Sequence, residues 1–127
     1  MPLIAVLDDD EPTRKFLSDE ITSAGCEFVG FERKDIFLQQ LPMISPDLII
    51  TDIHSPGMNG IDFLLQLKRQ PRYRNIPVII VSGNIDVGLA ARALELGVRD
   101  ILGKPFEIGD LHAAIREGLK SSQRNPT

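Results

Sequence analysis

Residues 46–60 read PDLIITDIHSPGMNG, and this stretch decides the fold class. Its first part, Leu48–Thr51, places large apolar residues in succession without polar alternation, as a strand buried on both faces requires. Asp52 ends this run, and the proline and glycines that follow it are typical of a tight loop. A short strand of this kind indicates a parallel sheet that is covered by helices on both sides.

Similar apolar runs recur along the chain, and the segments between them carry apolar residues every three or four positions, as helices buried on one face do. The predicted strands are residues 3–7, 26–31, 48–51, 78–81 and 98–102, and the predicted helices are about residues 12–24, 34–41, 60–69, 86–96 and 108–119. The second helix is expected to end at Pro42. Strands and helices in regular alternation predict a doubly wound α/β domain with a five-stranded parallel sheet.

The composition is that of an ordinary globular domain. The 127 residues fall within the usual size of one domain, and 43% apolar and 25% charged residues are close to average usage. We therefore expect one domain over residues 1–120, followed by a polar tail or the start of a linker over residues 121–127.

Charge and cysteine content argue against several classes of function. Acidic residues outnumber basic ones 18 to 14, so we expect no positive field that would bind nucleic acid directly. The apolar start of the chain is too short for a signal peptide or a membrane span. Cys26 is the single cysteine, which fits a reducing compartment and a small buried residue. These features predict a cytoplasmic protein without a membrane partner.

Polar residues follow the predicted strands at the carboxyl edge of the sheet, where open parallel sheets bind their ligands. They are Asp8, Asp9 and Asp10 after the first strand, Asp52 after the third, Ser82 after the fourth and Lys104 shortly after the fifth. Each residue alone is ordinary in a solvated loop. Carboxylates gathered at one edge, however, repel one another unless a cation lies among them. Their oxygens favour Mg²⁺, and the lysine is a second cation at the same edge.

These residue types also suit one kind of phosphate chemistry. No GxxxxGK[ST] loop follows the first strand, so nucleotide binding of the P-loop kind is not supported. A carboxylate can instead act as the nucleophile and form an aspartyl phosphate. A metal ion, a lysine and a hydroxyl then neutralise the phosphoryl oxygens.

Four segments in this order resemble the receiver domains of two-component response regulators, and the likeness covers about residues 3–119. IAVLDDDEPTRKFL resembles the first strand with its acidic pair, PDLIITDIHSPGMNGIDFL the phosphoacceptor strand and its loop, IPVIIVSG the fourth strand with its hydroxyl, and GVRDILGKPF the fifth strand with its Lys-Pro pair. The resemblance implies a flavodoxin-like (βα)5 fold, a three-layer sandwich with strand order 2-1-3-4-5.

The same resemblance implies a phosphoacceptor site. Asp52 would take a phosphoryl group from a sensor histidine kinase or a histidine phosphotransfer protein. Asp9, Asp52 and the backbone carbonyl of His54 would hold Mg²⁺, and Asp8 would act through a metal-bound water. The implied protein is a signalling switch rather than an enzyme.

The resemblance also assigns the remaining polar residues. Ser82 and Lys104 would contact the phosphoryl group, and the Lys104-Pro105 bond would be cis. Asp10 matches no site role and is expected to be an exposed loop residue. Many receivers carry an aromatic residue three positions before the lysine, but this chain has Ile101, so an aromatic rotation cannot report switching there.

The predicted output is a shift of the face formed by the fourth helix, the fifth strand and the fifth helix, which would meet a downstream effector or a second receiver. His54 and Asn84 would flank the phosphoryl group and tune its lifetime. An alternative is a receiver-like interaction module that works without phosphorylation. A phosphohydrolase is a third possibility, against which Asp52 is followed by Ile53 and His54, without a second acid two residues on.

Overall fold

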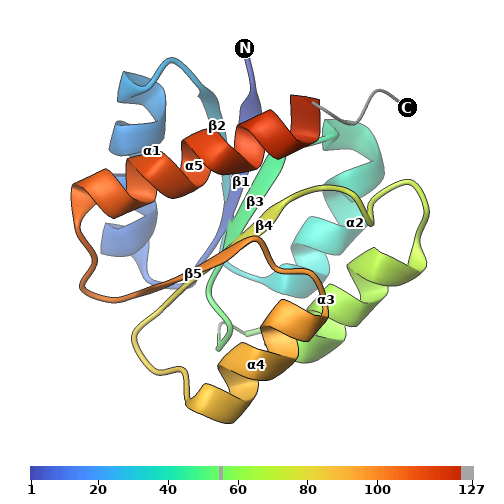
Figure 1. The fold of residues 1–127 in the computed structure, drawn as a ribbon. Coiled ribbons are helices and arrows are strands. Elements are labelled where there is room, and N and C mark those ends of the chain that lie inside the picture. Colours follow the sequence, from blue (N-terminus) through green and yellow to red (C-terminus); the bar gives the residue numbers. More distant parts are fainter. Residues whose placement is uncertain (55, 124–127) are drawn as a thin grey trace.

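The computed structural model describes residues 1–54 and 56–123, and it forms a five-stranded parallel sheet with helices on both faces (Figure 1). The strands are β1 (Leu3–Leu7), β2 (Glu27–Phe31), β3 (Leu48–Thr51), β4 (Val78–Ser82) and β5 (Asp100–Gly103). The helices are α1 (Glu11–Ser23), α2 (Lys34–Ile44), α3 (Gly60–Arg69), α4 (Val87–Glu95) and α5 (Ile108–Gln123). The strand order is β2-β1-β3-β4-β5, which confirms the predicted fold class.

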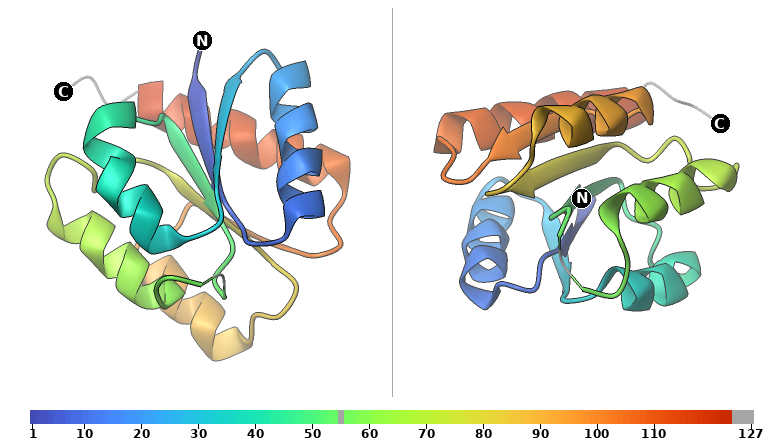
Figure 2. Two further views of the ribbon diagram at one scale, coloured as in Figure 1. Left: turned by 180° about the vertical axis from the view of Figure 1, so that it is seen from behind. Right: turned by 90° about the horizontal axis from the view of Figure 1, so that it is seen from below.

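The helices lie on both faces of the sheet (Figure 2), and an apolar layer holds them on each face. Helices α2, α3 and α4 cover one face, where Phe37, Phe63 and Ala93 are fully buried. Helices α1 and α5 cover the other face, with Leu17 and Leu111 among the buried residues. Strands β3 and β4 are buried at every position, because both of their faces are covered.

Helix α2 departs from the prediction, because it passes through Pro42 and continues to Ile44. The expected end at Pro42 is therefore wrong. Proline removes one backbone N–H near the end of the helix, while the buried side chain of Leu41 still fixes this last turn against the core. Ser45 caps the C-terminus of the helix: its φ of 45° is left-handed, and its N–H donates to the Leu41 carbonyl.

The end of the described chain and the single cysteine also bear on the predictions. Helix α5 extends through Gln123, beyond the predicted end at residue 119, and residues 124–127 of the predicted tail lie outside the described residues. Cys26 is a free thiol and only 7% exposed, as expected for a small core residue. Among the described helices, none combines the length and the apolar character that a membrane crossing needs.

Gly60, the first residue of α3, lets this helix start directly against the loop that follows β3. A Cβ at this position would lie 2.7 Å from the Ile53 carbonyl oxygen, which is backbone and cannot swing away. We expect Gly60→Ala to lower the free energy of unfolding by about 1–3 kcal/mol, measured by urea denaturation. Gly109→Ala is the matched control, because nothing lies within 4 Å of a Cβ there. Equal stability of the two variants would contradict the steric argument.

Candidate functional site

Asp52 follows β3 directly, and hydrogen bonds hold both its backbone and its carboxylate in place. Its N–H donates to the Leu7 carbonyl at 2.9 Å, and its own carbonyl accepts from the Thr51 hydroxyl at 2.9 Å. The His54 N–H donates to Asp52 Oδ1 at 3.0 Å. The side chain is 14% exposed, so its second oxygen, Oδ2, has limited access to solvent. This carboxylate is fixed in position and still reachable from outside.

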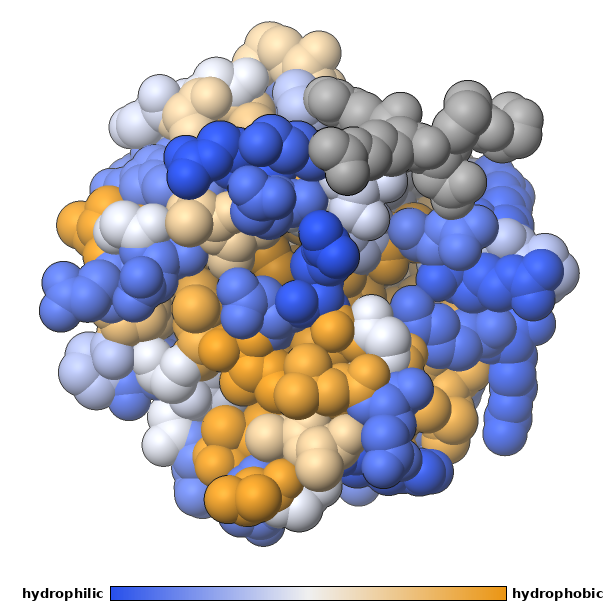
Figure 3. Space-filling model, viewed as in Figure 1, coloured by the Kyte–Doolittle hydropathy of each residue, from blue (hydrophilic) through white to orange (hydrophobic). Residues whose placement is uncertain are grey.

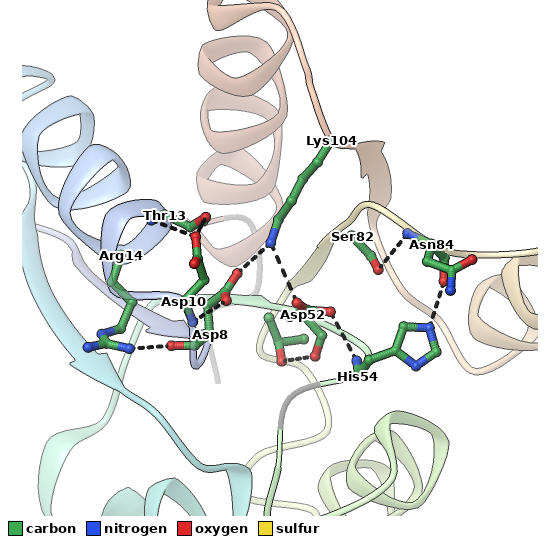
Figure 4. A network of polar contacts seen from close by, with 10 residues as sticks. Asp8, Asp10, Thr13, Arg14, Asp52, His54, Ser82, Asn84 and Lys104 are labelled. Atoms are coloured by element: carbon green, nitrogen blue, oxygen red, sulfur yellow. Dashed lines mark hydrogen bonds and ion pairs between the residues drawn. The ribbon is translucent and has the colours of Figure 1, made fainter.

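Lys104 points from the end of β5 toward the carboxylates that follow β1 and β3 (Figure 4). Its Nζ lies 2.9 Å from Asp8 Oδ2 and 3.5 Å from Asp52 Oδ2. Burial by itself would lower the pKa of Lys104, but the hydrogen bond to Asp8 and the charges of both carboxylates raise it above its ordinary value. Lys104 is therefore a permanent cation at neutral pH. The Lys104-Pro105 bond is cis, as the resemblance implies.

Asp8, Asp9 and Asp52 form what we call the acidic cluster. One oxygen of each carboxylate lies within 4.8 Å of the others, so a single cation could contact all three residues. Asp8 is buried, Asp52 is half-buried and Asp9 is exposed. Hard carboxylate oxygens with access from one side fit Mg²⁺, which keeps part of its water shell. The residues present thus fit the predicted magnesium site.

Ser82, His54 and Asn84 lie on the other side of Asp52 (Figure 4). Ser82 ends β4, is 1% exposed and accepts from the Asn84 N–H at 3.4 Å. The His54 ring points toward the loop after β4, with Nε2 2.6 Å from the backbone carbonyl of Asn84. This contact joins the loop after β3 to the loop after β4. Sequence reasoning placed both residues beside the site, but not this link between them.

Asp10 is exposed, as expected, but it has a structural task that the sequence prediction missed. It is the N-cap of α1, where its carboxylate accepts from the backbone N–H and the hydroxyl of Thr13. The hydroxyl contact lowers the pKa of Asp10. The Asp10 N–H in turn donates to Asp8 Oδ1 at 2.9 Å, which helps to orient that carboxylate. Asp directly before Glu11 and Pro12, the first residues of the helix, is the sequence signal for this cap.

Lys34 is the functional candidate that sequence reasoning did not identify. The pattern placed it only at the start of the second helix, yet its side chain is fully buried. It shares one helix face with Phe37 and Leu41, at spacings of three and seven residues, and this spacing could have shown that it points inward.

The Lys34 ammonium experiences two opposing influences. Burial lowers its pKa to about 8, which still leaves it charged at pH 7. The charges of Asp52, Asp9 and Asp8 act in the opposite direction and favour the charged ammonium. The site therefore contains two lysines beside three carboxylates.

The sequence matches known proteins over almost its whole length. The family model of the response regulator receiver domain matches residues 4–116. The transcriptional regulatory protein FixJ of Bradyrhizobium diazoefficiens is 36% identical over 120 residues, which cover 94% of this chain and 58% of that protein. The DNA-binding transcriptional regulator NtrC of Klebsiella pneumoniae is 34% identical, with 93% of this chain and 25% of that protein covered. The chain thus spans about half or a quarter of these curated relatives.

Solved structures give the same result. Full-length FixJ from B. japonicum superposes with a TM-score of 0.87 at 35% identity, covering 96% of this chain and 59% of that one. The signal receiver domain of a signal transduction histidine kinase from Syntrophus aciditrophicus gives a TM-score of 0.89 at 27% identity, covering 100% of this chain and 96% of that one.

Proposed function

Because this chain belongs to the family of response regulator receiver domains, we propose that it is a phosphoacceptor switch whose Asp52 carboxylate takes a phosphoryl group from a phosphohistidine. The observation that carries this proposal is the position of Lys104 Nζ, 2.9 Å from Asp8 and 3.5 Å from Asp52. Lys104 neutralises part of the acidic cluster before transfer, and its ammonium can contact the negatively charged phosphoryl oxygens afterwards. The switch is set by this transfer and is not a turnover enzyme.

The transfer needs one nucleophile and several cationic or donor groups. An oxygen of Asp52 forms the new P–O bond while the P–N bond to the donor imidazole breaks, and the imidazole then takes a proton from solvent. Asp9, Asp52 and the His54 carbonyl would hold Mg²⁺, and Asp8 would act through a metal-bound water; the ion supplies charge neutralisation at the phosphoryl oxygens when bound. Lys104 and the Ser82 hydroxyl would contact those oxygens from the protein side.

A histidine kinase or a histidine phosphotransfer protein fits as the donor. A groove lined by Pro12, Phe16, Pro105 and Phe106 lies beside Lys104. The Phe16 and Phe106 rings have centroids 6.0 Å apart, and Phe16 is 38% exposed. A partner helix that covers these rings would bring its phosphohistidine to the mouth of the site. We expect the two proteins to meet in the cytoplasm.

The signal would leave through α4, β5 and α5. Hydrophobic side chains gather over α4 and β5 in the lower half of Figure 3, and Val87 and Leu94 of α4 are exposed. Ile101 of β5 is half-buried against the core. A change at Ser82 would therefore reach this face through the β4–α4 loop and aliphatic packing. A downstream effector or a second receiver would bind there.

Acetyl phosphate and intact mass measurement test the proposal. With Mg²⁺, we expect the chain to gain one phosphoryl group, and with a chelator in place of Mg²⁺ we expect little or no gain. No gain under either condition would favour an interaction module that works without phosphorylation. Rapid multiple turnover of phosphomonoesters would favour a hydrolase instead.

The His54 ring is expected to control the lifetime of the aspartyl phosphate. His54→Ala removes the contact with the Asn84 carbonyl and opens the space between the two loops to water. We expect dephosphorylation to become faster by about threefold to tenfold, followed as loss of the phosphoryl mass with time. Asn84→Ala keeps the backbone carbonyl, so its effect should be smaller. Unchanged rates in both variants would contradict this prediction.

A further inference from the structure

Lys34 is an unusual residue to find fully buried at the start of a helix, because lysine is almost never enclosed unless its charge is compensated. The backbone around it is fixed to the phosphoacceptor loop. The Lys34 N–H donates to the Pro56 carbonyl at 3.3 Å, and Gly57 packs against the side chain of Asp35. The start of α2 therefore packs against Pro56 and Gly57 of the loop after Asp52.

The strand order explains how two lysines reach the same carboxylates. The acidic cluster follows the inner strands β1 and β3, whereas β2 and β5 are the edge strands of the sheet. Lys34 follows β2 and Lys104 follows β5, so they approach the acidic cluster from opposite edges. Lys104 contacts Asp8 and Asp52 directly. The charges of all three carboxylates, Asp9 included, raise the pKa of Lys34 against the effect of its burial.

Lys34 changes the net charge of the site at pH 7. Three carboxylates and two ammonium groups leave the site with one net negative charge, since −3 and +2 give −1. Bound Mg²⁺ would change this net charge to +1. Without Lys34 the site would carry −2 before binding, and bound Mg²⁺ would make it neutral. Like charges in a poorly solvated site repel strongly.

We propose that Lys34 is a built-in counter-ion of the metal site, which neutralises part of the acidic cluster when no metal is bound and thereby weakens Mg²⁺ binding. This inference rests on the proposed function, since it takes the acidic cluster to be the magnesium site. The positive charge that opposes Mg²⁺ before phosphorylation becomes favourable once a phosphoryl group adds negative charge. Lys34 thus ties metal affinity to the phosphorylation state.

Isothermal titration with Mg²⁺ at pH 7 tests this inference without any measurement of phosphorylation. Lys34→Met removes the charge and keeps an apolar side chain of similar length, and we expect it to tighten Mg²⁺ binding about tenfold or more. Lys68→Met is the matched control. Lys68 is a partly buried lysine on α3. It donates to the Arg74 carbonyl at 2.9 Å, and burial alone accounts for its lowered pKa. Its loss should leave Mg²⁺ affinity within about twofold.

The outcomes separate the two proposals. If Lys34→Met binds Mg²⁺ no more tightly than the unaltered chain, and Asp9→Asn abolishes binding in both backgrounds, the counter-ion inference is overturned and the magnesium site stands. If neither protein binds Mg²⁺, the magnesium part of the proposed function fails and the inference falls with it. Thermal melts establish that each variant is folded, and Lys34→Ala, which removes the same charge, replaces Lys34→Met if the latter does not fold.

Discussion

Asp52→Asn is expected to abolish phosphorylation, with the rate of phosphoryl gain from acetyl phosphate falling about a thousandfold or more. The amide has the shape of the carboxylate and can still accept the His54 N–H through its oxygen, so the backbone arrangement is retained. It lacks the negative charge that makes a carboxylate oxygen nucleophilic toward phosphorus. The measurement is the intact mass of the variant after incubation with acetyl phosphate and Mg²⁺.

Asp10→Asn provides the control for this substitution. It makes the same chemical change two residues from Asp8, at a position outside the acidic cluster. Asparagine caps helices about as well as aspartate does, so α1 should keep its N-terminus. We expect this variant to gain one phosphoryl group at close to the normal rate. A phosphoryl gain in Asp52→Asn equal to that of the unaltered chain would show that a different residue is the acceptor.

The fold could be predicted almost completely because its signals are local and strong. Leu48–Thr51 is apolar at three successive positions, and only a strand covered on both faces accommodates such a run between turn residues. Once the strands are placed, the sequence also shows which residues follow the carboxyl end of each strand. Since parallel strands present their carboxyl ends at one edge, residues as distant in sequence as Asp8 and Lys104 could be expected to meet.

The features that escaped prediction depend on packing rather than on local pattern. Proline usually ends a helix, but α2 continues beyond Pro42 to Ile44 because the buried Leu41 fixes its last turn against the core. Lys34 looks like an ordinary charged residue in a helical first turn, and only its helical spacing from two core residues hints that it faces inward. The contact of the His54 ring with the Asn84 carbonyl depends on how two loops approach each other in space. Sequence periodicity contains no information about that approach.

Lys104→Met is expected to lower the free energy of unfolding by about 3 kcal/mol at pH 7 without Mg²⁺, because it leaves the buried Asp8 carboxylate without the ammonium that contacts it. Asp8 has a side chain only 3% exposed, so water cannot take the place of the lysine. Urea denaturation measures the difference. Lys15→Met, which removes an exposed lysine 3.9 Å from Asp19 on α1, serves as the control and should change stability by less than about 0.5 kcal/mol.

The pH and metal dependence of this difference identify its origin. The pKa of Lys104 is raised in the folded protein, so its stabilising contribution is complete below the ordinary lysine pKa of 10.5 and is lost as the pH rises through the higher folded-state value. The difference in free energy of unfolding between the unaltered chain and Lys104→Met should therefore be constant from neutral pH to about pH 10 and decrease above it. Added Mg²⁺ should reduce the deficit of the variant, because a bound cation compensates the same carboxylates. A deficit that persists unchanged at high pH and with Mg²⁺ would mean that the lysine stabilises the site through packing of its hydrocarbon chain rather than through its charge.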